Sequence, residues 1–387
     1  GVDIADFNND NLPDILTLDM LPEENRRQKL LQLQENYESF QLMQNQDLHK
    51  QYMRNMLQLN NGDGSFSEIG QLAGISNTDW SWCPLIADFD NDGLKDIFIT
   101  TGYLRDYTNK DFLRYWGDYK IKKAMDREPM LMMDLVRAMP VTPFKNYIYK
   151  NNGDLSFSNK QQEWGFTDTR MSNAAVYADL DNDGDLDLVI SNINEEAFIY
   201  RNNASRKPGS NYLSIDLAGK NNTAATGAKV NLYSKGINQY QELNQNRGYL
   251  SAVSTSLHFG TGAAAVIDSV VITWPDNKRQ VIQQVNANQR LKISYEPAGK
   301  NIVQSPSFIV NNNNSISIPA SAKTVFEKSG GPIVYKHNDL SENDFKRQPL
   351  MLFMYSKTGP VIAKGDIDND GLDDFYLSGD MKTGGYV

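Results

Sequence analysis

The sequence has little of the residue types that support thiol and imidazole chemistry. Cys83 is the only cysteine among 387 residues, which excludes an internal disulfide bond and a thiolate metal cluster. The histidines number three, His49, His258 and His337. A nucleophile elbow, a phosphate-binding glycine-rich loop and an H-E-x-x-H motif are missing as well. The sequence therefore offers no familiar catalytic motif.

Long apolar runs and an excess of basic residues are also absent. No stretch approaches the roughly 18–20 uninterrupted apolar residues of a membrane-spanning helix, so we expect no transmembrane segment. Acidic residues outnumber basic ones by 48 to 38, and the formal net charge is -10. Nucleic acids and anionic membranes attract basic surfaces, so neither is an expected partner. Aromatic residues at 10% indicate a folded globular chain rather than a disordered one.

Much of the acidic charge is concentrated in four nine-residue loops with the pattern D-x-D-x-D-G-x-x-D. Side-chain oxygens at positions 1, 3, 5 and 9, with the backbone carbonyl of position 7, suit the 6–8 oxygen ligands that Ca²⁺ takes. Glycine at position 6 lets the backbone turn sharply around the ion. The sequence thus predicts four Ca²⁺ sites. The predicted ligands are Asp6, Asn8, Asp10, Leu12, Asp14, Asp88, Asp90, Asp92, Leu94, Asp96, Asp179, Asp181, Asp183, Asp185, Asp187, Asp366, Asp368, Asp370, Leu372 and Asp374.

The segments that flank these loops decide what kind of calcium motif they form. Short apolar runs precede and follow the loops, as at 85–87 and 97–99, and these runs predict buried strands. An EF-hand requires helices there, so it is excluded. The alternative, a polar hairpin without an ion, leaves four carboxylates that repel one another. Asn8 and Asn11 replace an aspartate and the glycine in the first loop, which we therefore predict to be the weakest site.

A repeat of about 50 residues underlies the irregular spacing of the loops. An Asn-Asn-Gly-Asp hairpin at 55–66 recurs at 146–157, and part of it recurs at 198–203. The spacing becomes regular once 21–52 and 103–144 are treated as insertions. A unit of this length with several short strands is typical of a β-propeller blade, whereas a β-sandwich has no reason to repeat in this way.

The two insertions differ in composition from the blades. Apolar residues recur at helical spacing in both, and the second is rich in methionine and aromatic residues such as Tyr115, Trp116 and Tyr119. Such a surface either packs against the scaffold or serves as an adaptable binding site. Extra loops on a rigid scaffold are where binding usually resides. We expect the function to lie in these insertions rather than in the calcium loops.

The loops and hairpins together resemble FG-GAP/VCBS repeats, the blade units of integrin α-subunit propellers. A later segment resembles the UnbV/ASPIC domain of the cartilage acidic protein-like family, through 227–230, 247–249, 257–260 and 271–276. The resemblance implies an all-β fold with integrin-α-like β-propeller blades, helical insertions and a small β-sandwich-like ASPIC domain. The expected boundaries are blades at 1–209, the ASPIC-like domain at 210–296, a linker at 297–325 and the start of a further repeat set at 326–387.

The resemblance also implies a function. It indicates a non-enzymatic, calcium-binding scaffold that contacts proteins or glycans outside the cell. Long helical insertions and renewed repeats look most like large surface proteins of Bacteroidota, which implies the outer-membrane surface and a place in an outer-membrane complex. The sequence is inside one copy of the loop motif by Asp6 and ends at Val387, shortly after another copy. We therefore expect a piece of a longer chain, with any secretion signal outside it.

One enzymatic alternative remains open. Some calcium-bearing propellers are polysaccharide lyases, and His337 with Lys336 and Arg347 could abstract a sugar proton. That alternative requires a cleft lined with lysine, arginine and tyrosine around one end of the propeller. Of the other histidines, His258 lies in a strand-like Leu-His-Phe-Gly run and is expected to be structural, whereas His49 lies in the first helical insertion and is expected to be solvated.

Overall fold

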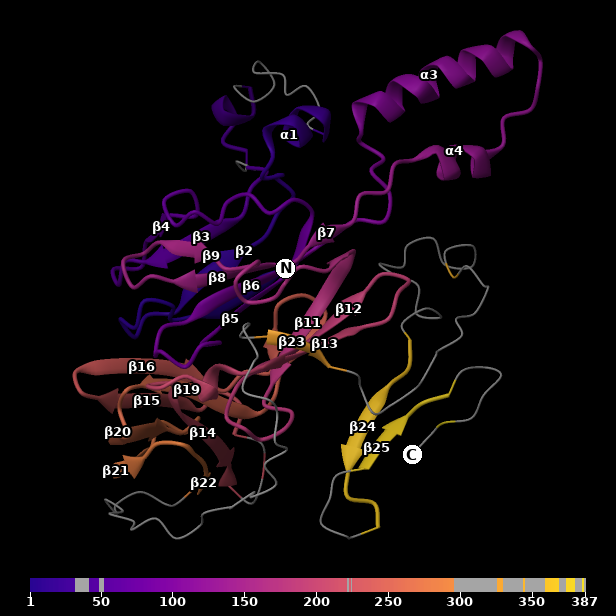
Figure 1. Ribbon diagram of the computed structural model, residues 1–387. Coiled ribbons are helices and arrows are strands. Elements are labelled where there is room, and N and C mark those ends of the chain that lie inside the picture. Colours follow the sequence, from indigo (N-terminus) through magenta and orange to yellow (C-terminus); the bar gives the residue numbers. More distant parts are fainter. Residues whose placement is uncertain are drawn as a thin grey trace. The chain divides into compact units, whose positions relative to one another are not determined.

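The computed structural model describes residues 1–31, 42–48, 52–220, 223, 225–295, 326–329, 344, 359–368, 374–379 and 385. The chain divides into two compact units, 1–329 and 330–387. The first unit contains three four-stranded antiparallel sheets and a separate domain of two sheets (Figure 1). This confirms the predicted all-β fold of propeller blades with helical insertions.

Each blade is a meander in which strands follow one another in chain order. The strands of the first blade are β1 (Val2–Ala5), β2 (Asp14–Thr17), β3 (Met56–Asn60) and β4 (Phe66–Glu68). Those of the second are β5 (Ser81–Ala87), β6 (Asp96–Thr101), β8 (Tyr147–Asn151) and β9 (Phe157–Asn159). Those of the third are β11 (Ser172–Ala178), β12 (Asp187–Asn192), β13 (Phe198–Asn202) and β23 (Phe326–Ser329).

The third blade obtains its fourth strand from far along the chain. In the first two blades an Asn-Asn-Gly-Asp hairpin leads directly from the third strand to the fourth. After β13 the sequence continues Asn-Asn-Ala-Ser, and a short 3-10 helix (Ala204–Arg206) follows instead of the hairpin. Strand β23 then pairs with β13, with Phe326 opposite Asn202. The segment predicted to open a further repeat set thus supplies, at 326–329, the edge of an existing blade.

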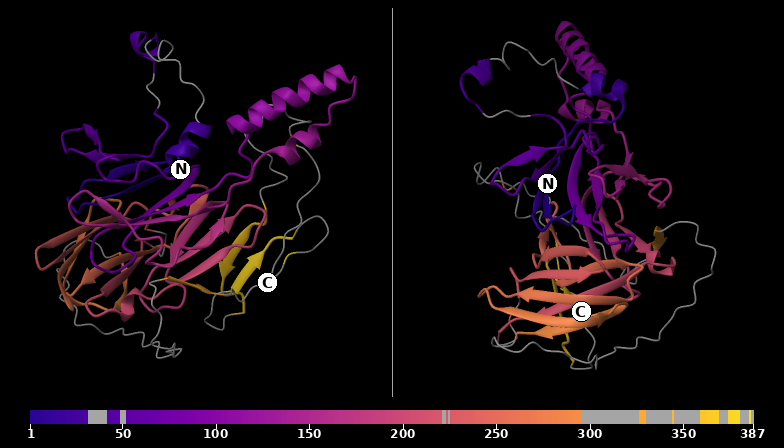
Figure 2. Two further views of the ribbon diagram at one scale, coloured as in Figure 1. Left: turned by 45° about the horizontal axis from the view of Figure 1, so that its top comes forward. Right: turned by 90° about the vertical axis from the view of Figure 1, so that its left-hand side faces the viewer.

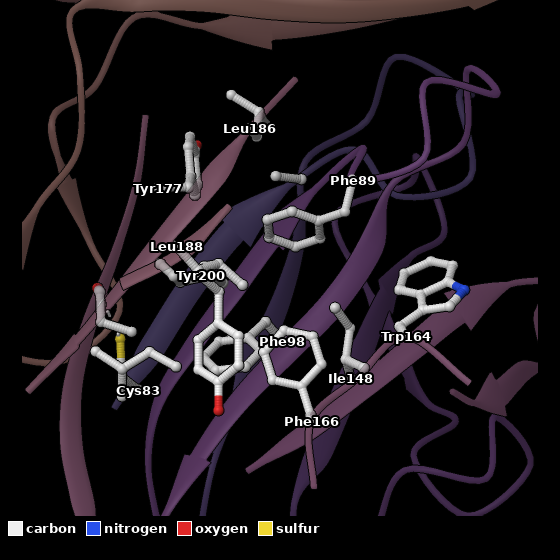
Figure 3. Close-up of a cluster of buried hydrophobic side chains, with 14 of the residues drawn as sticks. Cys83, Phe89, Phe98, Ile148, Trp164, Phe166, Tyr177, Leu186, Leu188 and Tyr200 are labelled. Atoms are coloured by element: carbon white, nitrogen blue, oxygen red, sulfur yellow. Dashed lines mark hydrogen bonds between the residues drawn. The ribbon is translucent and has the colours of Figure 1, made fainter. Parts of the chain in front are cut away.

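Buried aromatic and aliphatic side chains join neighbouring blades. One cluster lies between the second and third blades, where Phe98, Phe166 and Tyr200 pack together (Figure 3). The ring centroids of Phe98 and Phe166 are 5.4 Å apart, and those of Phe166 and Tyr200 are 4.7 Å apart. A second cluster, which includes Leu57 and Ile97, joins the first and second blades. Each blade therefore depends on its neighbour for a complete apolar core.

The two insertions contain helices and meet at one buried arginine. The first holds α1 (Asn25–Leu31), and the second holds α3 (Lys110–Met125) and α4 (Met132–Ala138). Arg27 of α1 donates to Asp106 of the second insertion at 3.0 Å and to Asp79 at 3.2 Å. Its guanidinium also lies 4.3 Å from the ring centroid of Phe144. The bases of the insertions are consequently part of the folded core. Phe144–Lys145, strand β7, pairs with β10 (Thr169–Arg170).

The remaining part of the first unit is a domain of two facing sheets, here named the two-sheet domain (211–295). One sheet contains β14 (Asn211–Ala218), β19 (Ser256–Gly262) and β22 (Gln289–Ser294). The other contains β15 (Lys229–Ser234), β16 (Ile237–Glu242), β20 (Val266–Thr273) and β21 (Arg279–Asn286). Leu213, Val230, Phe259 and Trp274 belong to one buried cluster between them. This arrangement matches the sandwich-like domain that the sequence predicts.

A hairpin of the two-sheet domain reaches the first strands of the blades. Its strands are β17 (Asn246–Arg247) and β18 (Ser251–Ala252). Arg247 forms a buried ion pair with Asp3 of β1 and donates to the carbonyl of Ile86 at 3.0 Å. Gly248 forms a bridge with Val2 in β1. The two-sheet domain is thus joined to the blades by polar contacts in which Asp3 is buried and Arg247 is largely buried.

The second unit has a single described hairpin. It consists of β24 (Ile362–Gly365) and β25 (Asp374–Leu377), which pair antiparallel with Ile362 opposite Leu377. The hairpin flanks the fourth acidic loop, so it repeats the strand–loop–strand pattern of the blades.

Candidate metal centres and the domain junction

The second acidic loop brings three carboxylates together in the interior. Oxygens of Asp88, Asp90 and Asp96 all lie within 4.8 Å of one another. The Oδ1 atoms of Asp88 and Asp90 are buried and have no hydrogen-bond partner. An unpartnered carboxylate oxygen in the interior is costly, and a cation would supply the missing partner. The residues of this loop therefore fit a bound divalent cation.

The electrostatics of the loops lead to the same expectation. Burial raises the pKa of Asp88 well above its usual range, and the neighbouring Asp92 and Asp90 raise it further. In the third loop burial raises the pKa of Asp179 to about 6 and that of Asp187 to about 7. A divalent cation at the same place would favour the ionised form of every one of these groups.

The structure gathers similar groups in the third and fourth loops. Asp179, Asp181 and Asp187 form one group, and Asp366, Asp368 and Asp374 form another. The predicted ligands Asp370 and Leu372 lie outside the described residues. In the first loop, Asn11 adopts a φ of 69°, so it makes the same left-handed turn that Gly93 makes with a φ of 96°.

The position-7 residues of the first three loops each donate a backbone amide to the carboxylate at position 5. The amides of Leu12 and Leu94 donate to the carboxylates of Asp10 and Asp92, at 2.8 and 2.9 Å. Their carbonyls are the predicted ligands. In the third loop, the amide of Asp185 donates to Asp183 at 3.2 Å. The side chain of Asp185 is used elsewhere, because both of its oxygens accept from the amide of Ser205.

The aspartate at position 9 has a second role that the sequence pattern does not reveal. Asp96 accepts hydrogen bonds from the amide of Phe89 at 3.1 Å and from the amide of Asn151 at 2.9 Å. Asp14 and Asp187 accept the equivalent pairs in their own blades. This carboxylate therefore fixes the loop to the third strand of its blade, besides offering oxygen to an ion.

Asparagines connect the loops of adjacent blades. Asn151 donates to the carbonyl of Phe7 in the first loop at 2.9 Å and to that of Lys95 in the second at 3.0 Å. Asn202 links the second and third loops in the same way. The position-4 asparagine adds another link, since Asn91 donates to the carbonyl of Gly184 at 3.1 Å. The repeated Asn-Asn pairs are the signal in the sequence for these links, although their spacing alone does not reveal which loops they join.

A basic residue accompanies the acidic loops of the second and third blades. Lys150 forms ion pairs with Asp90 and Asp92, and Arg201 forms them with Asp181 and Asp183. Leu59 occupies the corresponding place in the first blade. There the side-chain amide of Asn8 donates to Asp10 at 2.8 Å. The first loop thus lacks both one carboxylate and the basic residue that the second and third loops have nearby. That the first site is the weakest stays a prediction.

The two-sheet domain covers the acidic loops of all three blades. The amide of Gly262 donates to the carbonyl of Asn91 at 2.9 Å, and Asn231 donates to Asn11 of the first loop at 2.7 Å. A Cβ added to Gly260 would lie 2.0 Å from the Oδ2 atom of Asp88. Glycine is therefore required at 260 for this approach. Arg290 donates to Asn182 of the third loop at 3.4 Å.

Comparison with known proteins accounts for both parts of this arrangement. A model of the FG-GAP-like repeat matches residues 48–99 and 132–190, and a model described as ASPIC and UnbV matches residues 218–300. The chain combines FG-GAP-like repeats with an ASPIC/UnbV domain. The two-sheet domain is this ASPIC domain. Neither model indicates an enzyme family.

Cartilage acidic protein 1 from three vertebrates is similar to the chain. The human protein is 25% identical over 280 residues, which are 65% of this chain and 42% of that protein. The Xenopus tropicalis protein is 26% identical over 270 residues, or 62% of this chain and 41% of that protein. The mouse protein is 31% identical over 126 residues, or 31% of this chain and 19% of that protein. The chain thus spans less than half the length of these relatives.

The histidine of the ASPIC domain is structural, as the sequence predicts. His258 is buried, and its Nε2 atom lies 2.7 Å from Oδ1 of Asn91 in the second loop. Its Nδ1 atom lies 3.3 Å from the hydroxyl of Ser214. Burial lowers the pKa of His258 to about 4, so the ring is neutral at physiological pH. The residues proposed for a lyase, His337, Lys336 and Arg347, lie outside the described residues, as does His49.

The helical insertion of the second blade exposes apolar side chains. Of α3 only Phe112 is buried, and α4 buries no residue. Trp116 and Tyr119 stack on each other with ring centroids 5.8 Å apart, and Tyr115 is 50% exposed. Both views in Figure 2 show α3 and α4 outside the sheets of the blades. Packing against the scaffold, one of the two alternatives from the sequence, does not account for these residues. No helix in the described part of the chain is long and apolar enough to span a bilayer.

Proposed function

We propose that the chain is a calcium-stabilised, non-enzymatic scaffold of the extracellular or outer-membrane surface that binds a protein or a glycan. The calcium part rests chiefly on one observation, the buried and unpartnered Oδ1 atoms of Asp88 and Asp90. FG-GAP propellers with an ASPIC domain favour an extracellular interaction role. The exposed helical insertion of the second blade supports a partner that binds there.

In this proposal the second loop holds the ion with Asp88, Asp90, Asp92 and Asp96 and with the carbonyl of Leu94. The corresponding residues of the other loops would do the same. When bound, the ion neutralises carboxylates that otherwise repel one another. Because asparagine side chains tie each loop to the next, an ion in one loop stabilises the contact between two blades.

Thermal unfolding with EDTA or with millimolar Ca²⁺ tests the calcium part. An ion that binds only the native state stabilises it by about 2.7 kcal/mol at a hundred times its Kd. Wild type is expected to melt at a higher temperature with Ca²⁺. Asp88→Asn should lose part of that gain, yet in EDTA it should be at least as stable as wild type because it removes a buried charge. Equal wild-type melting temperatures in the two buffers would contradict the proposal.

The control for this comparison is Asp118→Asn. Asp118 is an exposed acid on α3, outside all four loops. This variant should respond to Ca²⁺ as wild type does. A loss of the response in Asp118→Asn would mean that overall charge, and not the loop, controls the effect.

The binding part requires a variant that leaves the core intact. Residues 113–138 can be replaced by a Gly/Ser linker that preserves the buried Phe112 and also Asp106 and Thr142, the partners of Arg27. A second variant, Met125→Lys with Met132→Lys and Met133→Lys, changes only exposed side chains. Both are expected to fold and to lose capture of envelope proteins or glycans from the native organism. The control Leu72→Lys, at a 71% exposed position on a blade, should retain capture. If both the linker variant and the triple methionine variant still capture the partner fully, the binding surface lies elsewhere.

A further inference from the structure

One strand of the ASPIC domain, β19, lies beside the second acidic loop. Side chains of a strand point alternately to its two faces. Leu257 and Phe259 belong to the buried cluster of the ASPIC domain, so His258, Gly260 and Gly262 lie on the opposite face. All three of these residues contact the second loop or would meet it through an added Cβ. This face of β19 therefore joins the ASPIC domain to the loop.

The same face of β19 holds Asn91 of the loop at two points. The amide of Gly262 donates to the carbonyl of Asn91 at 2.9 Å, and the Nε2 atom of His258 lies 2.7 Å from its Oδ1 atom. Asn91 has a φ of 60°, and its side-chain amide donates to Asp185 of the third loop at 2.8 Å. The ASPIC domain thus fixes a residue in the turn of the second loop.

Gly260 lies against the first aspartate of the loop. A Cβ at this position would lie 2.0 Å from the Oδ2 atom of Asp88 and 2.6 Å from the Cα atom of Asn91. The same Oδ2 atom accepts from the amide of Gly93 at 2.7 Å. Asp88 is 3% exposed, and its Oδ1 atom is buried without a hydrogen-bond partner. Neighbouring backbone therefore fixes this carboxylate, and Oδ1 is the oxygen that remains for a cation.

At the other two loops the ASPIC domain contacts residues that are not predicted ligands. Asn231 donates to Asn11 of the first loop at 2.7 Å. In the third loop, a Cβ added to Gly184 would lie 1.9 Å from the Cε1 atom of Tyr212. At the second loop the contact includes a predicted ligand with a free, buried oxygen. The second loop is therefore the place where a cation and the ASPIC domain act on one side chain.

We propose that β19 positions Asp88 for a cation, so that cation binding at the second loop and docking of the ASPIC domain strengthen each other. The inference rests on the proposed calcium-stabilised scaffold and adds a regulated contact between two domains. Without a cation, the carboxylates of Asp88, Asp90 and Asp96 repel one another, because their oxygens lie within 4.8 Å. Their separation disturbs the close contact with Gly260. Coupling between two equilibria is reciprocal, so the cation adds to docking what docking adds to cation affinity.

Hydrogen exchange of the wild-type chain in EDTA and in saturating Ca²⁺ tests the coupling. The amide of Gly262 donates to Asn91 across the junction, whereas the amide of Gly227 donates to Leu243 within the ASPIC domain at 2.9 Å. Ca²⁺ should slow the exchange of Gly262 by roughly 5-fold to 150-fold, the usual range of coupling between sites. It should leave the exchange of Gly227 nearly unchanged.

Two results of this measurement would overturn the proposal. Equal exchange of Gly262 in the two buffers would show that docking does not depend on the cation. Equal slowing of Gly262 and Gly227 would indicate general stabilisation rather than tighter docking. If Ca²⁺ still raised the melting temperature in either case, the calcium-stabilised scaffold would stand without the coupling.

Gly260→Ala tests the position of Asp88 directly. The added Cβ should displace Asp88, so the rise in melting temperature that Ca²⁺ produces should become smaller. A purely structural role of Gly260 would lower the melting temperature equally in EDTA and in Ca²⁺. In an Asp88→Asn background, Gly260→Ala should reduce the rise no further, because both changes act on one carboxylate.

The control for Gly260→Ala is Gly117→Ala. Gly117 lies in α3, and a Cβ there would meet no atom within 4 Å. This variant should keep the wild-type rise in melting temperature. An undiminished rise in Gly260→Ala, or additive losses in the double variant, would overturn the proposal. If Gly260→Ala does not fold, the exchange measurement on wild type still decides.

Discussion

The two ends of the second blade differ in the kinds of side chain that they bury and expose. At the end with the acidic loop, charged residues such as Asp88, Lys95 and Asp96 are at most 3% exposed. At the end with the helical insertion, Met125, at 79%, and Met132, at 65%, are exposed. Polar groups are usually outside and large apolar groups inside. Both ends of this blade depart from that rule, because the loop end buries charged groups and the insertion end exposes apolar ones.

This contrast distinguishes residues that stabilise the fold from exposed residues that are available for contact with a partner. Buried carboxylates are tolerated at the loop end because backbone amides donate hydrogen bonds to several of their oxygens, and a cation would be the partner of the oxygens that remain. Exposed methionines at the other end gain nothing for the fold. A contiguous exposed apolar surface commonly marks an interaction site. The loop end therefore builds the scaffold, and the helices α3 and α4 present a surface.

The largest expected effect lies at the base of the insertions. Arg27→Ala leaves Asp79 and Asp106 buried without their cation. Removing one partner of a buried ion pair costs about 3–5 kcal/mol. Urea unfolding should show a loss of this size, although Arg27 belongs to an insertion. The exposed ion pair offers the control, since Lys123→Ala beside Glu128 should leave the stability almost unchanged. A small effect of Arg27→Ala would mean that the bases of the insertions contribute little to the stability of the folded core.

The loop end should give the next effect. Asp96→Ala leaves the amides of Phe89 and Asn151 buried without acceptors. Each unsatisfied group costs about 1–3 kcal/mol, and removal of a buried charge offsets part of that cost, so a loss of roughly 2–4 kcal/mol is expected even in EDTA. Asp92→Ala is the matched control, because Asp92 is less buried and lies in the same loop. Its loss should appear mainly when Ca²⁺ is present. Equal losses in EDTA would show that position 9 has no structural role of its own.

The pattern of repeats sufficed to predict the blades and the acidic loops. Fixed spacing of aspartates and glycine is a local property, and so are the apolar runs on either side of Asp88 and Asp179. Strand β23 could not be predicted in this way. Its pairing with β13 joins Asn202 to Phe326 across the whole ASPIC domain, and no local pattern encodes a contact at that distance.

The candidate site was predictable to the extent that each residue acts alone. The aspartates could be named as ligands because their type and spacing suffice. The roles of Asn91 and Gly260 depend on neighbours from another blade or domain, and that of Lys150 depends on a loop that lies far from it in the sequence of its own blade. Gly260 allows the ASPIC domain to approach Asp88 because it has no Cβ. The residues around Gly260 in the sequence do not indicate that Asp88 lies nearby.

The junction with the ASPIC domain should show a pH dependence. Burial lowers the pKa of His258 to about 4, below its ordinary value near 6.5. The unfolded chain then binds more protons than the native one between these values. Stability from this group is complete above pH 6.5 and is lost as the pH falls toward 4. The expected loss is about 2 kcal/mol at pH 5. His258→Gln in saturating Ca²⁺ should flatten that part of the profile, and an unchanged profile would contradict this origin.

The smallest effect on stability is expected for substitutions on the exposed helices. Met132 of α4 is 65% exposed, whereas Met171, before β11, is 6% exposed. Truncation of a buried methionine to alanine costs about 2–5 kcal/mol, because the contacts of the removed atoms are lost and a cavity remains. Substitutions at exposed positions usually change stability by less than about 0.5 kcal/mol. Met171→Ala should therefore shift the urea midpoint strongly and Met132→Ala hardly at all. A substantial shift for Met132→Ala would show that α4 packs against another part of the molecule, and the helices would then belong to the scaffold and not to a binding surface.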